Sequence, residues 1–161
     1  MLKPTRQLLS AALILAAALM FGSRPASAQG KDSLAGNWVL NFGKSDFQNV
    51  PPPTNKTITI AAVDNGFDQK VRIQNANGAW DELEFTAKYD GKEYPMPTES
   101  PLNAVTLKRV DANTVEQIGI IRKKPAETVT YKVSNGGKML TITTVGTEDH
   151  TNDYVQVYDK K

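Results

Sequence analysis

The single histidine of the chain lies in an acidic stretch that could bind a metal ion or carry a proton. His150 stands within Glu148-Asp149-His150-Thr151-Asn152-Asp153, and imidazoles and carboxylates are common metal ligands. One histidine among acids on a short turn lacks the ligand spacing of a zinc site. Serine catalysis would need this same histidine, and the sequence has no Gly-x-Ser-x-Gly turn. A solvated turn is therefore the preferred interpretation.

A pair of carboxylates could perform the acid and base steps of glycoside hydrolysis. Glu82 and Glu84 are two residues apart, which places both side chains on the same face of a strand. They alternate with Leu83 and Phe85, so we expect the glutamates to face water and the apolar pair to face the interior. The glycines lie in turns and form no phosphate-binding loop. Catalysis is thus the least favoured function, and no cofactor or metal is expected.

A third set of residues could hold a small molecule. These residues lie on strand faces that we expect to point inward, where aromatic and aliphatic side chains alternate with a few polar ones. The candidates for ligand contact are Phe85, Tyr89, Leu107, Arg109, Gln117 and Tyr131. Arg109 shares the face of Leu107, so its guanidinium needs an acid or a ligand carboxylate as a partner, unless it reaches solvent at the strand end.

These candidates lie on segments with the period-two alternation of half-buried strands. The first segment, 37–42, places Trp38, Leu40 and Phe42 on one face. Further strands are expected at 56–63, 67–74, 79–89, 92–94, 104–110, 114–122, 127–134, 138–145 and 153–158. No segment after the first 28 residues has a helical period. Either face of 114–122 and of 138–145 could be the inner one.

The number and spacing of these segments predict an all-β protein with a single antiparallel up-and-down barrel of about 8–10 strands. If each strand pairs with the next, the longer connections gather at one end, the mouth: 43–55, 75–78, 95–103, 123–126 and 146–152. The tight turns gather at the other end, the floor: 64–66, 90–91, 111–113 and 135–137. An even strand count also lets the last strand pair with the first.

The start of the first strand carries a resemblance to a known group of barrels. Gly36-Asn37-Trp38 resembles the Gly-x-Trp signature of lipocalins and related calycins. The wider pattern is similar to small exported bacterial proteins with lipocalin-like barrels, whose function is largely undescribed. Its further segments are Lys44-Ser45-Asp46-Phe47, Ala87-Lys88-Tyr89-Asp90-Gly91-Lys92, Leu107-Lys108-Arg109-Val110-Asp111-Ala112-Asn113-Thr114 and Val157-Tyr158-Asp159.

The resemblance implies a barrel for small apolar ligands with a lid loop at 43–55. It also implies that a basic residue near the end of the last strand, Lys160 or Lys161, packs across Trp38. We interpret Gly36 and Trp38 as structural, because burying an indole contributes on the order of a few kcal/mol. The resemblance transfers no catalytic residue.

The first 28 residues have the pattern of a secretory signal peptide. Lys3 and Arg6 precede an apolar run over 8–21, which is too short to span a membrane, and Ala26-Ser27-Ala28 supplies small residues for cleavage. Cleavage after Ala28 would leave a barrel domain at 29–161 with 16 basic and 17 acidic side chains. This near-neutral balance gives no reason to expect a nucleic-acid partner. Without cysteine, the domain has no disulfide and no lipid anchor, so a periplasmic or extracellular location is expected.

Three functions follow from these observations. The favoured one is an exported barrel that binds a small apolar or amphipathic ligand under the 43–55 lid. The alternative is a structural or interaction protein whose barrel is filled by its own side chains. The third is an enzyme that uses Glu82 and Glu84 or His150. The sequence leaves the ligand and the oligomeric state open.

Overall fold

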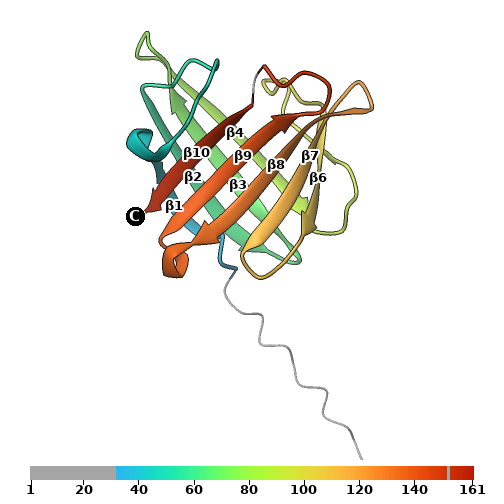
Figure 1. The fold of residues 1–161 in the computed structure, drawn as a ribbon. Helices are drawn as coiled ribbons and strands as arrows, with labels where there is room; N and C mark the ends of the chain where they lie inside the picture. Colours follow the sequence, from blue (N-terminus) through green and yellow to red (C-terminus); the bar gives the residue numbers. More distant parts are fainter. Residues whose placement is uncertain (1–31, 152) are drawn as a thin grey trace, which may run out of the picture.

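The computed structural model describes residues 32–151 and 153–161, and the expected signal peptide lies outside this range (Figure 1). Its ten strands are β1 (Gly36–Leu40), β2 (Asn55–Val63), β3 (Gly66–Gln74), β4 (Trp80–Lys88), β5 (Tyr94–Pro95), β6 (Ala104–Arg109), β7 (Thr114–Ile121), β8 (Lys124–Ser134), β9 (Met139–Gly146) and β10 (Tyr154–Lys160). Two 3-10 helices are present, η1 (Phe42–Lys44) and η2 (Asn135–Gly137). No helix within the described ranges is long and apolar enough to cross a membrane.

The strands form one antiparallel sheet in the order β4-β3-β2-β1-β10-β9-β8-β7-β6-β5, which curls into a barrel (Figure 1). The last strand pairs with the first, with Trp38 opposite Lys160. The outermost strands, β4 and β5, share no ladder, so the barrel is nearly closed. The predicted up-and-down topology is confirmed. Strand β5 is only two residues long because prolines at 95 and 97 cannot donate ladder hydrogen bonds.

Most connections have the length expected for their end of the barrel, and one does not. We predicted a mouth loop at 123–126, but β8 already begins at Lys124. The connection is a two-residue turn at Arg122 and Lys123, whose φ angles are 50° and 65°. Two consecutive residues in the left-handed region are typical of a tight hairpin turn. Neither residue is Gly or Asn, so no turn signal marked the position.

The first strand ends earlier than predicted. Residue Phe42 lies in η1 and is 45% exposed, whereas Trp38 and Leu40 are buried. The strand stops because the Asn41 side chain accepts a hydrogen bond from the backbone N–H of Lys44 at 3.1 Å. This cap starts the short helix and turns Phe42 away from the core.

The structure explains why the Gly-x-Trp element needs its glycine and its tryptophan. The indole of Trp38 is fully buried, and the Lys160 ammonium lies 4.8 Å from its ring centroid. This confirms Lys160 as the basic residue packed across the indole. The lysine stem passes directly over Gly36, where a Cβ would overlap Lys160 Cε. The φ of Gly36 is 150°, so both space and backbone favour glycine there.

The structure also shows which face of 114–122 and of 138–145 points inward. In β7, Val115 and Gln117 face inward, and in β9, Leu140, Ile142 and Thr144 do so. A register shift in the β7–β8 ladder falls between Gly119 and Ile120. A side chain at Gly119 would meet Leu102 at 3.0 Å, so the interior is tightly filled at this point.

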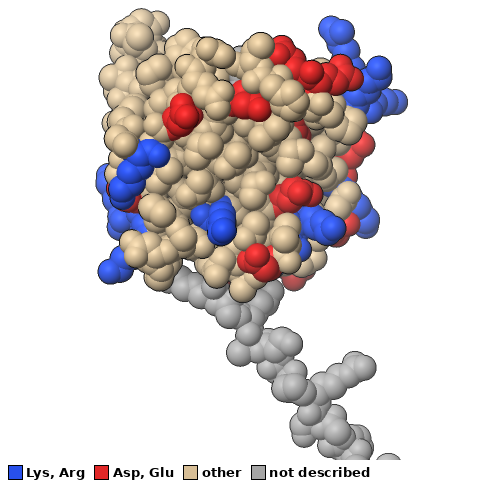
Figure 2. All heavy atoms as spheres, in the orientation of Figure 1, with Lys and Arg blue, Asp and Glu red and all other residues tan. Residues whose placement is uncertain are grey.

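The packed core occupies the floor half of the barrel. Phe67 is fully buried, and its ring centroid lies 5.9 Å from Phe85, 6.0 Å from Tyr89 and 5.7 Å from Tyr131. Such aromatic pairs contribute about 0.5–1.5 kcal/mol each beyond their burial. The outer face over β8, β9 and β10 carries few charges (Figure 2). The mouth half of the interior retains free volume.

Candidate ligand-binding site

The mouth half of the barrel contains a cavity of about 290 Å³, which we call the interior cavity. Its apolar walls come from Ile58, Val71, Ile73, Leu83, Phe85, Met96, Leu102, Val129 and Ile142. Its polar lining comes from Lys56, Gln69, Gln117, Glu127, Tyr131, Thr144, Tyr154 and Gln156. A volume near the lower end of the usual range of about 300–1,000 Å³, with mainly apolar walls and a few polar groups, is typical of a small-molecule site.

Three polar side chains meet at mid-depth in the interior cavity. The Tyr131 hydroxyl donates to Gln117 Oε1 at 3.0 Å, and both residues are buried. Burial raises the pKa of Tyr131, so its hydroxyl stays protonated and remains a donor. Gln69 lies beside the same hydroxyl, and its buried Oε1 accepts no hydrogen bond from any described residue. An acceptor left in this state costs about 1–3 kcal/mol, so a ligand hydroxyl or amide would bind there favourably.

A lysine lies at the mouth end of the same cavity. Lys56 Nζ donates to Gln156 Oε1 at 2.8 Å, and the Tyr158 hydroxyl donates to the same oxygen at 2.8 Å. No carboxylate of the described residues lies within the 4.0 Å of an ion pair from this ammonium. Burial lowers the pKa of Lys56 to about 8. The cavity therefore presents a cation whose observed partner is a neutral amide.

An acid lies on the other side of the mouth. Glu127 is half-buried and lines both the interior cavity and a rim hollow of about 380 Å³ beside Glu148 and Asp149. Burial raises the pKa of Glu127 above its usual range. Thr144 is shared by the same two hollows, so Glu127 and Thr144 separate the interior from the rim.

A third hollow, the outer groove, lies beside β4 on the outside of the barrel and has a volume of about 480 Å³. It is lined by Ile73, Trp80, Asp81, Glu82, Leu83, Glu99, Ser100 and Pro101. Four of these residues also line the interior cavity: Ile73, Leu83, Ser100 and Pro101. The loop 96–103 thus separates the groove from the interior, at the seam where β4 and β5 share no ladder.

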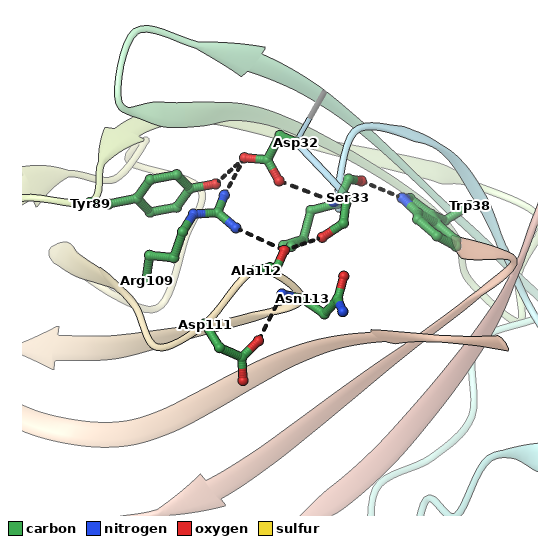
Figure 3. Close-up of polar contacts among 9 residues, drawn as sticks. Asp32, Ser33, Trp38, Tyr89, Arg109, Asp111, Ala112 and Asn113 are labelled. Carbon is green, nitrogen blue, oxygen red and sulfur yellow. Dashed lines mark hydrogen bonds and ion pairs between the residues drawn. The ribbon is translucent and has the colours of Figure 1, made fainter. Parts of the chain in front are cut away.

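The floor is closed by the segment that precedes β1 (Figure 3). Asp32 accepts hydrogen bonds from the Tyr89 hydroxyl at 2.6 Å and from Arg109 Nη2, and we call these three residues the floor network. The Arg109 guanidinium also lies 4.2 Å from the centroid of the Tyr89 ring. Leu34 is fully buried, and its carbonyl accepts from Trp38 Nε1 at 2.8 Å. The floor end therefore offers no opening comparable to the mouth.

The six predicted ligand-contact residues divide between cavity and floor. Phe85, Gln117 and Tyr131 line the interior cavity. Leu107 is fully buried in the packed core, and Tyr89 and Arg109 belong to the floor network. Both alternatives for Arg109 hold in part, because it pairs with an acid and its side chain is still 29% exposed. The acid of this ion pair is Asp32. Leu107, Tyr89 and Arg109 therefore hold the floor and lie outside the lining of the interior cavity.

The predicted lid does not cover the cavity. Asp46 and Val155 exchange backbone hydrogen bonds of 2.8 Å, and Ser45 Oγ accepts from the N–H of Val157 at 2.9 Å. These bonds hold the segment along β10, and no residue of 43–55 lines the interior cavity. The expectation of a lid at 43–55 is therefore wrong, and the loop at 96–103 covers the interior instead.

The catalytic candidates lie on the outside. Glu82 forms ion pairs with Lys70 Nζ at 2.6 Å and Arg72 Nε at 3.2 Å, and Glu84 lies 3.8 Å from Lys70. His150 is exposed, with Nδ1 3.2 Å from Asp153 Oδ2. Within the described ranges, no three metal-ligating side chains cluster. Both glutamates face water as predicted, since their carboxylates are neutralised on the outer face of β3 and β4.

Most polar cavity residues were not identified from the sequence: Lys56, Gln69, Glu127, Thr144, Tyr154 and Gln156. The signal that could have found them is their position in the alternation. Lys56 shares its face with Ile58 and Ile60, and Gln69 shares its face with Phe67 and Val71. A polar residue on an otherwise apolar inward face needs a partner, and that partner can be a ligand.

Fold and cavity together define a class: a ten-stranded, nearly closed antiparallel up-and-down barrel with an internal cavity. A scan of known protein families finds no match to this chain. A search of curated proteins likewise finds none.

Solved structures share the fold at low sequence identity. A fatty acid binding protein of Schistosoma mansoni in complex with arachidonic acid has 14% identity and a TM-score of 0.62, covering 81% of this chain and 98% of that one. Lipid binding protein 8 of Caenorhabditis elegans has 12% identity and a TM-score of 0.55, covering 80% and 96%. A zebrafish ileal bile acid-binding protein complexed with cholic acid has 13% identity and a TM-score of 0.53, covering 80% and 99%. At these identities the likeness concerns the fold.

Proposed function

We propose that this protein is an exported binding barrel that holds one small apolar or amphipathic molecule in its interior cavity. The observation that carries the proposal is the cavity of about 290 Å³, with its aliphatic and aromatic walls and its polar groups at mid-depth and at the mouth. Each methylene buried there contributes about 0.8 kcal/mol, so a tail of about ten would gain about 8 kcal/mol before the costs of association. In this proposal the protein is periplasmic or extracellular, after cleavage of the signal peptide at 1–28.

The same cavity argues against the alternative of a barrel filled by its own side chains. A filled barrel would bury its inward residues against one another throughout, as the floor half does around Phe67. Proteins of the same fold bound to arachidonic acid and to cholic acid also support an amphipathic ligand. The seam beside loop 96–103 is the proposed access path, because that loop lines both the outer groove and the interior cavity.

The test uses a fluorescent apolar probe and a pair of matched variants. We expect N-phenyl-1-naphthylamine, an uncharged apolar probe, to bind the wild-type protein with a rise in fluorescence. Ile142→Trp fills the cavity from its wall and should abolish that rise, whereas Thr141→Trp, on the outer face of the same strand, should leave it unchanged. Circular dichroism confirms that both variants are folded. Equal probe binding by both variants would overturn the proposal.

A further inference from the structure

Among the described residues, Lys56 is the lysine that lines the interior cavity, and its position on the barrel is well defined. It is the second residue of β2, at the mouth end, and it pairs with Ile73 of β3. Two further pairs lead down into the cavity, Ile58 with Val71 and Ile60 with Gln69. Phe85 then lies opposite Gln69. At about 3.3 Å per residue, the level of Gln69 and Phe85 is about 13 Å below Lys56.

The surroundings of the ammonium lack a counter-ion. A buried ammonium is normally paired with an acid, because leaving it unpaired in a low-dielectric site is unfavourable. Its observed partner is Gln156 Oε1, and that oxygen already accepts from Tyr158. Other lysines of the described chain that lie near acids pair with them on the surface, as Lys70 does with Glu82. The cavity therefore holds a positive site next to apolar walls.

We propose that Lys56 binds the anionic head group of a carboxylic acid at the mouth, while the apolar tail of that acid extends down toward Phe85 and Tyr131. The inference rests on the proposed function, because it names the chemical class and the orientation of the ligand in the same cavity. A carboxylate would supply the missing counter-ion and would form a charge-assisted hydrogen bond with Nζ. A neutral ligand with the same tail would leave the ammonium unpaired.

Other titratable groups face this end of the cavity. Tyr154 and Tyr158 lie on β10, Tyr131 and Glu127 on β8, and Asp81 at the rim of β4. Burial raises the pKa values of the three tyrosines, so they stay neutral at the pH values used below. Burial also raises the pKa of Glu127, and the Lys56→Arg variant, which leaves Glu127 in place, separates its titration from that of Lys56.

The experiment compares dodecanoic acid with dodecan-1-ol, which share a tail and differ in the head group. Binding is measured by isothermal titration calorimetry at pH 7.0 and pH 9.5. At pH 7.0 we expect the acid to bind at least tenfold more tightly. With a Lys56 pKa of about 8, the protonated fraction falls from about nine-tenths to about one-thirtieth between the two pH values. The affinity for the acid should therefore fall by up to about thirtyfold and approach that for the alcohol, and the affinity for the alcohol should not change.

Three variants separate the charge from the packing. Lys56→Met should remove both the preference for the acid and its pH dependence, while it keeps alcohol binding. Lys56→Arg keeps the charge at both pH values, so the preference should persist and the pH dependence should disappear. Lys70→Met, which removes an exposed lysine on the outer face of β3, should keep both effects.

The outcomes distinguish this inference from the proposed function. Equal, pH-independent binding of acid and alcohol would overturn the role of Lys56 and leave the binding barrel in place. Binding of neither compound, with no fluorescence rise from the apolar probe, would overturn the proposed function itself.

Discussion

The substitution Lys56→Met should stabilise the protein at neutral pH, although it removes a hydrogen bond. Burial lowers the pKa of Lys56 from 10.5 to about 8 in the folded state. At 1.36 kcal/mol per pK unit, this difference corresponds to an upper limit of about 3 kcal/mol against folding when the amine is charged. Lys56 is partly exposed, and solvent screening reduces the value to about 1–2 kcal/mol. Methionine fills similar space without a charge.

The effect has a defined dependence on pH. Below about pH 8 both states are protonated, so the full penalty of Lys56 is present. Between about pH 8 and 10.5 the folded protein releases the proton while the unfolded chain keeps it, so the wild-type stability rises relative to the variant. The advantage of Lys56→Met should therefore be largest at pH 7 and should shrink toward pH 10.5. The buried tyrosines affect both proteins equally and cancel in the difference.

The assay is urea unfolding followed by tryptophan fluorescence at pH 7, 8, 9 and 10. Lys108→Met, at an exposed position on β6, is the matched control and should show no such trend. A stability difference between wild type and Lys56→Met that is constant over this pH range would refute the reasoning. It would mean that the amine reaches solvent in the folded protein.

Three further predictions concern other parts of the barrel. Trp38→Ala should destabilise the protein by about 3–5 kcal/mol, because the indole is fully buried, and an unchanged unfolding midpoint would contradict its structural role. Asp32→Asn should cost about 1–3 kcal/mol in the same unfolding assay, because Arg109 loses its acid, while apolar probe binding should not change. Ser100→Trp should slow probe association in stopped-flow measurements if the ligand passes loop 96–103, whereas Asn49→Trp should not; equal rates would place the access path elsewhere.

Local sequence patterns predicted the strands well, because a residue's side of a strand follows from alternation alone. Val129, Tyr131 and Val133 were assigned to one face, and all three are buried. In β7 and β9 both faces carry apolar and small residues, so the pattern could not choose. The choice of Gln117 and Ile142 as inward residues was made by packing against the neighbouring strands. The turn at Arg122 and Lys123 was predicted one residue too late and too long, at 123–126, because its residues are not typical of a left-handed turn.

The residues of the candidate site also divide into those that the sequence predicted and those that only the tertiary structure brought together. The sequence alone determined a β-barrel with an aromatic at its floor and Phe85 and Tyr131 on the inner surface, because these assignments need only the alternation along each strand. Which polar groups meet was decided by the tertiary structure: Asp32 reaches Arg109 across 77 residues, and Lys56 reaches Gln156 across 100. The alternation along a strand assigns each residue to a face but gives no distance across the barrel. Only closure of the sheet brings such residues together and leaves Lys56 beside apolar cavity walls, with no carboxylate of the described residues in ion-pair distance.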